Sequence, residues 1–294
     1  VERAVLLTES YKQTENMPIV RRRAMAFKHI VENIPIVIRP EELIVGSTTV
    51  NPRSAQHFPE YSYSWMEAEL DTIEKRSADP FHISEENKNI LRGIYPYWKG
   101  RTTSELATSY MSPEALKAIE HNIFTVGNYF YNGIGHISVD YAKVLKVGYR
   151  GIIEEAKAAL EKANIYDADY VKRRDFLESV IICAEAAICY AKRYAALAKA
   201  EAEKCTDEMR RQELLTIAEN CKNVPEKPAQ NFMEACQSFW FVQVLLQIES
   251  NGHSISPGRF DQYMYPFYKA DMDKGLAIMK NNSEFFAKVM ILTD

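Results

Sequence analysis

The 294-residue sequence has few of the features that mark secreted, disulfide-rich or membrane-spanning proteins. Its five cysteines form no C-x-x-C pair, and their odd number points to free thiols in a reducing compartment rather than to a disulfide framework. No uninterrupted apolar run approaches the length of a membrane span, and the start Val-Glu-Arg carries no signal-peptide pattern. We therefore expect a cytoplasmic protein with no membrane partner.

An excess of charge of one sign is also absent. Thirty-six basic residues against 40 acidic ones give a formal net charge of −4, and the longest basic run is Arg21-Arg22-Arg23. This balance argues against nucleic acid as a partner. With 47% hydrophobic residues the chain can build a substantial core, and its length permits one large domain or two smaller ones.

Apolar residues recur at helical spacing through the second half of the chain. This pattern predicts helices over residues 152–162, 171–204 and 207–221. Residues 232–246 are apolar on nearly every face and predict a helix buried in a large core, surrounded by protein that lies partly outside this chain. The β-branched stretch 43–50 is the best strand candidate. The predicted fold class is mainly α with a few short strands.

A polar cluster, Asn-Gly-His-Ser at residues 251–254, follows the predicted buried helix. Buried polar groups are costly unless something binds them, and Gly252 and Gly258 allow the backbone to approach a ligand closely. This composition suits a pocket wall. The same Asn-Gly and Ser-Pro-Gly steps are also ordinary turn signals, so composition alone slightly favours a plain helix stop followed by a loop.

A second glycine-rich segment covers residues 124–145. Gly127, Gly133 and Gly135 alternate with aromatic residues and bracket His136, which predicts a loop with a tightly packed backbone. A single histidine on such a loop is more often structural than catalytic. Two histidine-bearing loops in one chain favour a site, although sequence alone does not place them side by side.

Other polar and sulfur-bearing residues fit structural roles. Asp140 and Asp261 each follow one of the two loops and are expected to cap helices. Cys183 and Cys189 fall among the apolar residues of the predicted helix 171–204, which indicates inert core thiols. A hydrolase with a cysteine–histidine pair is therefore a weak alternative, because no cysteine lies in a loop beside either pocket histidine.

The two loops carry a family resemblance. The string N-G-H-S-I-S-P-G-R-F-D-Q-Y-M-Y-P-F-Y (251–268) resembles glycyl radical enzymes, specifically the B12-independent glycerol and propane-1,2-diol dehydratases of the pyruvate formate-lyase superfamily. F-T-V-G-N-Y-F-Y-N-G-I-G-H-I-S-V-D-Y-A-K-V-L (124–145) is similar to the first pocket-lining stretch of that family. Further matches run from residue 2 to about 275 and weaken from Leu276 onward. The resemblance implies a complete fold in which two half-barrels form a ten-stranded α/β barrel wrapped in helices.

Two motifs of the resembled family are missing from the 294 residues. The reactive cysteine of the family lies in a Gly-Cys-Val-Glu type motif, and its radical glycine lies in an Arg-Val-x-Gly-Tyr type loop. We therefore expect residues 1–294 to be the N-terminal portion of a pyruvate formate-lyase-type domain, inactive without the radical-bearing C-terminal part. The longer parent would be a homodimer that needs a glycyl radical installed by an S-adenosylmethionine-dependent activating enzyme, and no cofactor or metal is expected in this portion.

The resemblance also implies a reaction, the dehydration of glycerol to 3-hydroxypropanal or of propane-1,2-diol to propanal. In the family, a thiyl radical takes hydrogen from C1 of the diol and the C2 hydroxyl then leaves as water. His136 matches the family histidine that contacts the departing hydroxyl, where imidazole suits proton donation. Asn128, His253 and Ser254 match positions that hydrogen-bond or border the diol.

Other functions stay open at this point. The parent could be another glycyl radical eliminase, such as a choline trimethylamine-lyase, or a formate acetyltransferase-like enzyme. From a different class, the chain could be a non-catalytic helical scaffold in which the pocket residues are vestigial.

Overall fold

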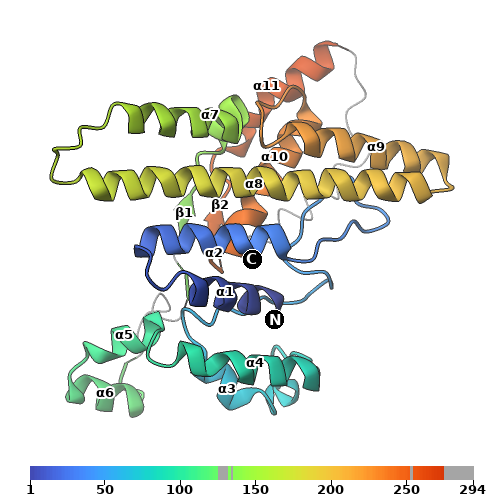
Figure 1. The fold of residues 1–294 in the computed structure, drawn as a ribbon. Coiled ribbons are helices and arrows are strands. Elements are labelled where there is room, and N and C mark those ends of the chain that lie inside the picture. Colours follow the sequence, from blue (N-terminus) through green and yellow to red (C-terminus); the bar gives the residue numbers. More distant parts are fainter. Residues whose placement is uncertain (125–131, 134, 252–253, 275–294) are drawn as a thin grey trace.

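The computed structural model describes residues 1–124, 132–133, 135–251 and 254–274 of the protein (Figure 1). Helices dominate these ranges, and the two strands are two residues long each. The predicted fold class, mainly α with a few short strands, is therefore confirmed. In the described ranges no helix combines the length and apolar character that crossing a membrane requires.

The helices and strands follow one another along the chain in an order that separates the two strands by four long helices. Their bounds are α1 (Glu2–Gln13), α2 (Ile19–Asn33), α3 (Ser64–Glu69), the 3-10 turn η1 (Ile73–Lys75), α4 (Glu85–Trp98), α5 (Thr103–Ser109), α6 (Pro113–Glu120), β1 (Ile137–Ser138), α7 (Tyr141–Glu161), α8 (Tyr170–Lys204), α9 (Glu208–Asn223), α10 (Phe232–Glu249), β2 (Ile255–Ser256) and α11 (Phe260–Asp273).

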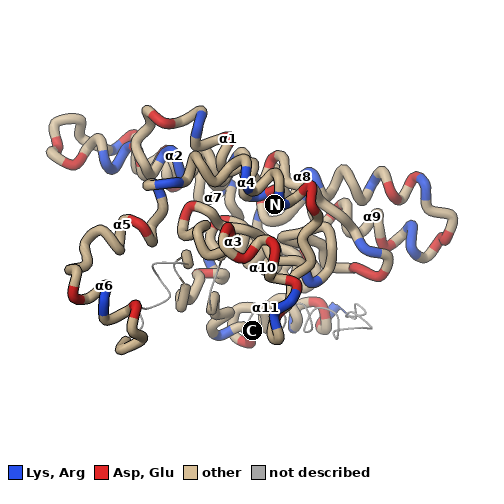
Figure 2. Tube along the Cα trace, turned by 90° about the horizontal axis from the view of Figure 1, so that it is seen from below, with Lys and Arg blue, Asp and Glu red and all other residues tan. Residues whose placement is uncertain are grey.

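The long helix α8 is the centre of the helical layer. It packs against α2, α7 and α9 (Figure 1). Small buried side chains on α8, among them Ala184, Ala187 and Ala191, recur at spacings of three to four residues and let its neighbours approach closely. The three helices predicted from periodicity are confirmed as α7, α8 and α9, although α7 begins earlier than predicted, at Tyr141. Acidic and basic residues are interspersed along the outer helices (Figure 2).

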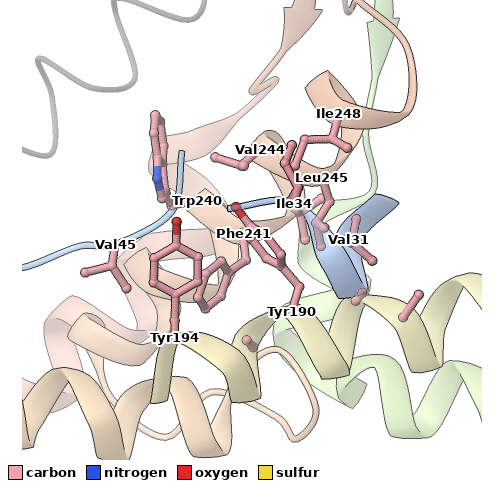
Figure 3. Packing of buried hydrophobic residues seen from close by; sticks show 14 of the residues in the cluster. Val31, Ile34, Val45, Tyr190, Tyr194, Trp240, Phe241, Val244, Leu245 and Ile248 are labelled. Atoms are coloured by element: carbon pink, nitrogen blue, oxygen red, sulfur yellow. The ribbon is translucent and has the colours of Figure 1, made fainter. Parts of the chain in front are cut away.

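Helix α10 is buried over most of its surface, as a sequence that is apolar on nearly every face predicts. Phe241 lies against Tyr190 and Tyr194 of α8, with ring centroids 5.9 and 5.8 Å apart (Figure 3). Phe239, Trp240, Phe241 and Leu245 are each at most 4% exposed within this chain. The expectation that protein outside the chain covers part of this helix is therefore wrong for these four side chains.

The predicted strand at residues 43–50 is wrong, since this segment is an irregular loop. Side chains, rather than a partner strand, form hydrogen bonds with its backbone groups. The amide of Gln237 accepts from Val45 N–H at 2.9 Å and donates to Val45 O at 2.7 Å, and the indole of Trp240 donates to Gly46 O at 2.9 Å. Two of the β-branched residues that prompted the strand prediction, Ile44 and Val45, are buried here without a sheet.

The two aspartates expected to cap helices differ. Asp140 is the N-cap of α7 and accepts a hydrogen bond from Lys143 N–H at 3.0 Å, which confirms the prediction. Asp261 lies one residue inside α11, whose N-cap is Arg259 and has no side-chain cap, so that prediction is wrong. Its carboxylate instead lies 3.6 Å from the guanidinium of Arg259.

Candidate active site

The two glycine-rich loops meet through a parallel pair of short strands. Ile137 of β1 is in register with Ile255 of β2, and Ser138 is in register with Ser256. His136 and Ser254 each precede their strand by one residue. The register of the strands therefore places the two residues opposite each other on neighbouring backbone segments. The structure thus brings together two of the predicted site residues that lie far apart in the sequence.

His136 and Ser254 also share an unusual backbone conformation. Their φ angles are +53° and +60°, in the left-handed region that non-glycine residues seldom occupy. Such conformations persist where the surrounding structure determines them. Both side chains are exposed and therefore accessible to a small solute. Each loop turns at the residue that carries the candidate functional group.

The remaining predicted site residues, Asn128 and His253, lie outside the described residues. Their assignment to a substrate site stays a prediction. The roles of His136 and Ser254 likewise stay predictions.

Asn251 connects the two loops directly. Its Oδ1 accepts a hydrogen bond from Gly133 N–H at 2.7 Å, and its Nδ2 donates to Oδ1 of Asn132 at 2.9 Å. The backbone at Gly133 is also tightly enclosed, because a Cβ built there would lie 2.6 Å from Cβ of Ser250. Sequence reasoning missed this connection. Each loop contains an Asn-Gly step, and the one at residues 251–252 was interpreted only as part of a pocket wall or a turn.

A buried arginine supports the end of α10, immediately before the second loop. Arg3 donates to the backbone carbonyls of Ile248 at 2.6 Å and Glu249 at 3.1 Å. It also pairs with the carboxylate of Glu60 at 2.6 Å. Burial alone raises the pKa of Glu60, but the positive charges of Arg3 and Arg23 outweigh it and hold that pKa below its usual range. The last turn of α10 is thereby fixed by charge-assisted hydrogen bonds.

Arg23 extends this support toward the first loop. It pairs with Glu249 at 2.7 Å and with Glu60 at 3.1 Å, and it donates to the hydroxyl of Tyr61 at 2.9 Å. The Tyr61 hydroxyl in turn would lie 2.9 Å from a Cβ built on Gly133. Burial raises the pKa of Tyr61 to about 12, so the phenol stays protonated at neutral pH. Sequence reasoning noted Arg23 only as part of a basic run.

The cysteines offer no activated nucleophile near the loops. Burial raises the pKa of Cys183 to about 12 and raises the pKa of the buried thiols Cys221 and Cys236 as well. A thiol whose pKa is raised by apolar surroundings is inert at neutral pH. The hydrolase alternative therefore finds no support in these three residues. In the part of the chain that the structure describes, no cluster of His, Cys, Asp and Glu has the makings of a metal site.

The arrangement places two exposed residues, one with an imidazole and one with a hydroxyl, on neighbouring backbone segments. Imidazole can donate or accept a proton, and a hydroxyl can both donate and accept a hydrogen bond. Together they suit a small polar substrate that carries hydroxyl groups.

Comparisons with known proteins place the chain in one family. A family model described as "Pyruvate formate lyase-like" matches residues 1–293. A solved structure reporting 1,2-propanediol dehydration in Roseburia inulinivorans shares 60% identity over 95% of this chain and 33% of its own, with a TM-score of 0.92. The glycerol-bound B12-independent glycerol dehydratase from Clostridium butyricum shares 56% identity over 97% of this chain and 35% of its own, with a TM-score of 0.89.

A curated relative shows a different substrate within the same family. The (2S)-3-sulfopropanediol dehydratase of Klebsiella oxytoca is 41% identical over 278 residues, which are 92% of this chain and 34% of that protein. The chain thus spans about a third of the length of the relatives it matches.

Proposed function

Because the chain belongs to the pyruvate formate lyase-like family of glycyl radical enzymes, we propose that it is the N-terminal portion of a longer glycyl radical enzyme that dehydrates a small diol. The expected reactions are glycerol to 3-hydroxypropanal and propane-1,2-diol to propanal. The 60% and 56% identities to structures that concern 1,2-propanediol and glycerol support a diol over the sulfonated substrate of the more distant relative.

The parallel register of Ile137 with Ile255 is the observation that carries the proposal. It sets His136 and Ser254 next to each other, each at a left-handed turn and each exposed. Adjacent groups of this kind can contact the two hydroxyls of one vicinal diol. The positions of these residues agree with the roles that the family resemblance implies.

Within this site His136 is the catalytic residue, as proton donor to the C2 hydroxyl that leaves as water. Hydroxide is a poor leaving group, and a proton delivered as the C–O bond breaks lowers that barrier. Ser254, together with Asn128 and His253, binds and orients the diol. Radical chemistry at C1 is supplied by residues of the longer protein outside this chain, after activation by an S-adenosylmethionine-dependent enzyme.

The cellular setting of the proposed enzyme follows from the same reasoning. We place it in the cytoplasm, where its free thiols stay reduced, with the activating enzyme as a transient partner and a second copy of itself as a dimer partner. No cofactor or metal ion is assigned to residues 1–294.

The proposed reaction is tested with the longer protein that contains this chain. The protein is activated anaerobically with its activating enzyme and S-adenosylmethionine and is then offered glycerol, propane-1,2-diol, choline and (2S)-3-sulfopropanediol in parallel. We expect 3-hydroxypropanal or propanal, with at least about tenfold higher kcat/KM for a simple diol than for choline or the sulfonate.

Two controls make the assay decisive. The protein without the activating enzyme, and residues 1–294 alone, should form no aldehyde. A protein that shows a full glycyl radical signal and turns over only choline or the sulfonate would overturn the diol assignment.

A further inference from the structure

We propose that Asn251 is a positioning residue that sets the separation between His136 and Ser254. The proposal rests on the proposed function, since it concerns how that site is held in its working geometry. Asn251 is hydrogen-bonded to the backbone of Gly133 and to the side chain of Asn132. It acts through the connection between the two loops.

The connection lies at the same register position in both loops. Gly133 precedes Ile137 by four residues, and Asn251 precedes Ile255 by four residues, while Ile137 and Ile255 are themselves in register. The two loop segments are therefore joined at both ends, by the Asn251 hydrogen bond on one side and by the β1–β2 ladder on the other. In sequence, His136 and Ser254 fall between these two connections, each one residue before its strand.

The direction of the hydrogen bonds is fixed by chemistry. A backbone N–H can only donate, so the Asn251 atom 2.7 Å from Gly133 N is the amide oxygen. The amide nitrogen then faces Oδ1 of Asn132 at 2.9 Å and donates to it. Asn251 is thus used as acceptor and donor at once, whereas Asn132 needs only an oxygen at this contact.

Close packing also restricts the movement of the two loops relative to each other at this contact. A Cβ on Gly133 would meet Cβ of Ser250 at 2.6 Å and Oδ1 of Asn251 at 3.1 Å, so the first loop rests directly on the second. The second loop is itself anchored, because Ser250 N–H donates to Leu246 O of α10 at 3.0 Å and Arg3 holds the carbonyl of Ile248. Asn251 consequently transfers the fixed position of α10 to the loop that carries His136.

Loss of this contact should affect turnover more than folding. A proton donor and a substrate-binding hydroxyl work together only when both reach the same small molecule, and a misplacement of about 1 Å can cost on the order of 100-fold in rate. The core around α10 does not depend on Asn251, which is only half-buried.

The test compares three variants of the activated longer protein. Asn251→Leu removes both hydrogen bonds at similar size, Asn251→Asp keeps the acceptor and removes the donor, and Asn132→Asp keeps the oxygen that accepts. With propane-1,2-diol or glycerol we expect kcat to fall about 10- to 100-fold in Asn251→Leu and at least about threefold in Asn251→Asp. Asn132→Asp should keep kcat within about twofold of wild type and should keep the wild-type melting temperature, and all three variants should retain the wild-type radical content.

A second readout is independent of turnover. Amide hydrogen exchange of the peptide containing Gly133, measured on the protein before activation, should speed up in Asn251→Leu and stay slow in Asn132→Asp. Unchanged exchange and unchanged kcat in Asn251→Leu would overturn the proposal, as would equal losses of kcat in Asn251→Asp and Asn132→Asp. Faster exchange in Asn251→Leu with no diol turnover by the wild-type protein would support the connection and contradict the proposed function.

Discussion

Arg3 and Glu60 form a buried ion pair, with 2.6 Å between Nη2 of the arginine and Oε1 of the glutamate and side-chain exposures of 1% and 6%. The pair joins the first helix of the chain to the last turn of α10, because Arg3 also donates to Ile248 O. Arg3 donates to the carbonyls of Ile248 and Glu249, three and two residues before Asn251. The geometry of the candidate site therefore depends on residues at the opposite end of the described chain.

The first prediction is that Glu60→Gln strongly destabilises the protein. The substitution leaves the buried guanidinium of Arg3 without its counter-charge, and breaking a buried pair costs about 3–5 kcal/mol. The free energy of unfolding of residues 1–294, measured by urea denaturation, should fall by that amount.

Glu155→Gln provides the matched control. Glu155 pairs with Lys143 at 2.6 Å, but these side chains are 55% and 44% exposed, so its loss should cost less than about 1 kcal/mol. Equal effects of Glu60→Gln and Glu155→Gln would show that the Arg3 pair does not stabilise the fold in the way its burial indicates.

A second prediction contrasts two glycines. Gly133→Ala places a methyl group 2.6 Å from Cβ of Ser250, which forces the two loops apart and should cost about 1–3 kcal/mol. Gly93, inside α4, has nothing within 4 Å of a Cβ, and Gly93→Ala should raise the free energy of unfolding by about 0.5–1 kcal/mol. Thermal unfolding of the two variants should shift in opposite directions, and a neutral Gly133→Ala would refute the close contact between the loops.

A third prediction concerns the pH dependence of stability. His57 is 8% exposed, and its Nε2 has no hydrogen-bond partner among the described residues. Burial lowers its pKa from 6.5 to about 4. Between these values the unfolded chain binds the proton more readily, so the folded protein should lose up to about 3 kcal/mol as the pH falls from 6.5 to 4.

The contribution of His57 is isolated by substitution. Glu60 also loses its favourable charge as the pH falls, so the informative quantity is the difference in slope between wild type and His57→Phe. His57→Phe should flatten the decline between pH 6.5 and 4, whereas His121→Gln, at an exposed position, should leave it unchanged. A slope unaffected by His57→Phe would contradict the burial of a neutral imidazole.

The helices were predictable from sequence because their signal is local. Apolar spacing along α8 and the uniformly apolar α10 needed no knowledge of their neighbours. The loop at residues 43–50 was not predictable, because its β-branched residues are typical of a strand. The groups that hydrogen-bond to its backbone, the side chains of Gln237 and Trp240, lie nearly two hundred residues later in the sequence. The local composition indicates that part of the segment is buried, but it does not indicate which groups form hydrogen bonds with its backbone.

The residues of the candidate site are a prediction from the sequence, whereas the adjacency of two of them comes only from the structure. His136 and Ser254 were found from glycine-rich loops and a family resemblance, but their adjacency comes from a parallel pairing of segments more than a hundred residues apart. A two-residue strand leaves almost no alternation in the sequence. The contacts of Asn251 and Arg3 were missed because hydrogen bonds to a distant backbone have no spacing that a sequence can display.

A fourth prediction concerns an open apolar groove of about 600 Å³ between α2, α7, α8 and α10. Ile19 and Phe176 on its wall are 65% and 58% exposed. Residues 1–294 should therefore bind a fluorescent hydrophobic dye in the folded state. Ile19→Ser combined with Phe176→Ser should lower the fluorescence at least about twofold, whereas Tyr166→Ser, at an 88% exposed residue outside the groove, should not. Dye binding that survives the double substitution would place the apolar surface elsewhere.

The last prediction separates the two functional residues of the proposed site, in the activated longer protein. If His136 protonates the departing hydroxyl, His136→Ala should depress kcat with glycerol by about 10²- to 10⁴-fold, because general acid catalysis contributes on that scale. If Ser254 holds the diol through one hydrogen bond, Ser254→Ala should cost about 0.5–1.5 kcal/mol of binding, a rise in KM of roughly three- to tenfold with a smaller change in kcat.

Both variants should still form the glycyl radical, since in this scheme radical installation takes place outside residues 1–294. His136→Gln is the discriminating control, because glutamine can pack and hydrogen-bond before β1 and yet cannot deliver a proton as imidazole does. Near-normal kcat in His136→Gln would remove the proton-donor role and leave His136 as a structural residue that holds its left-handed turn. Equal losses in His136→Ala and Ser254→Ala, in kcat and KM alike, would mean that the pair only lines the pocket, because a catalytic acid and a binding hydroxyl must differ in which kinetic constant they change.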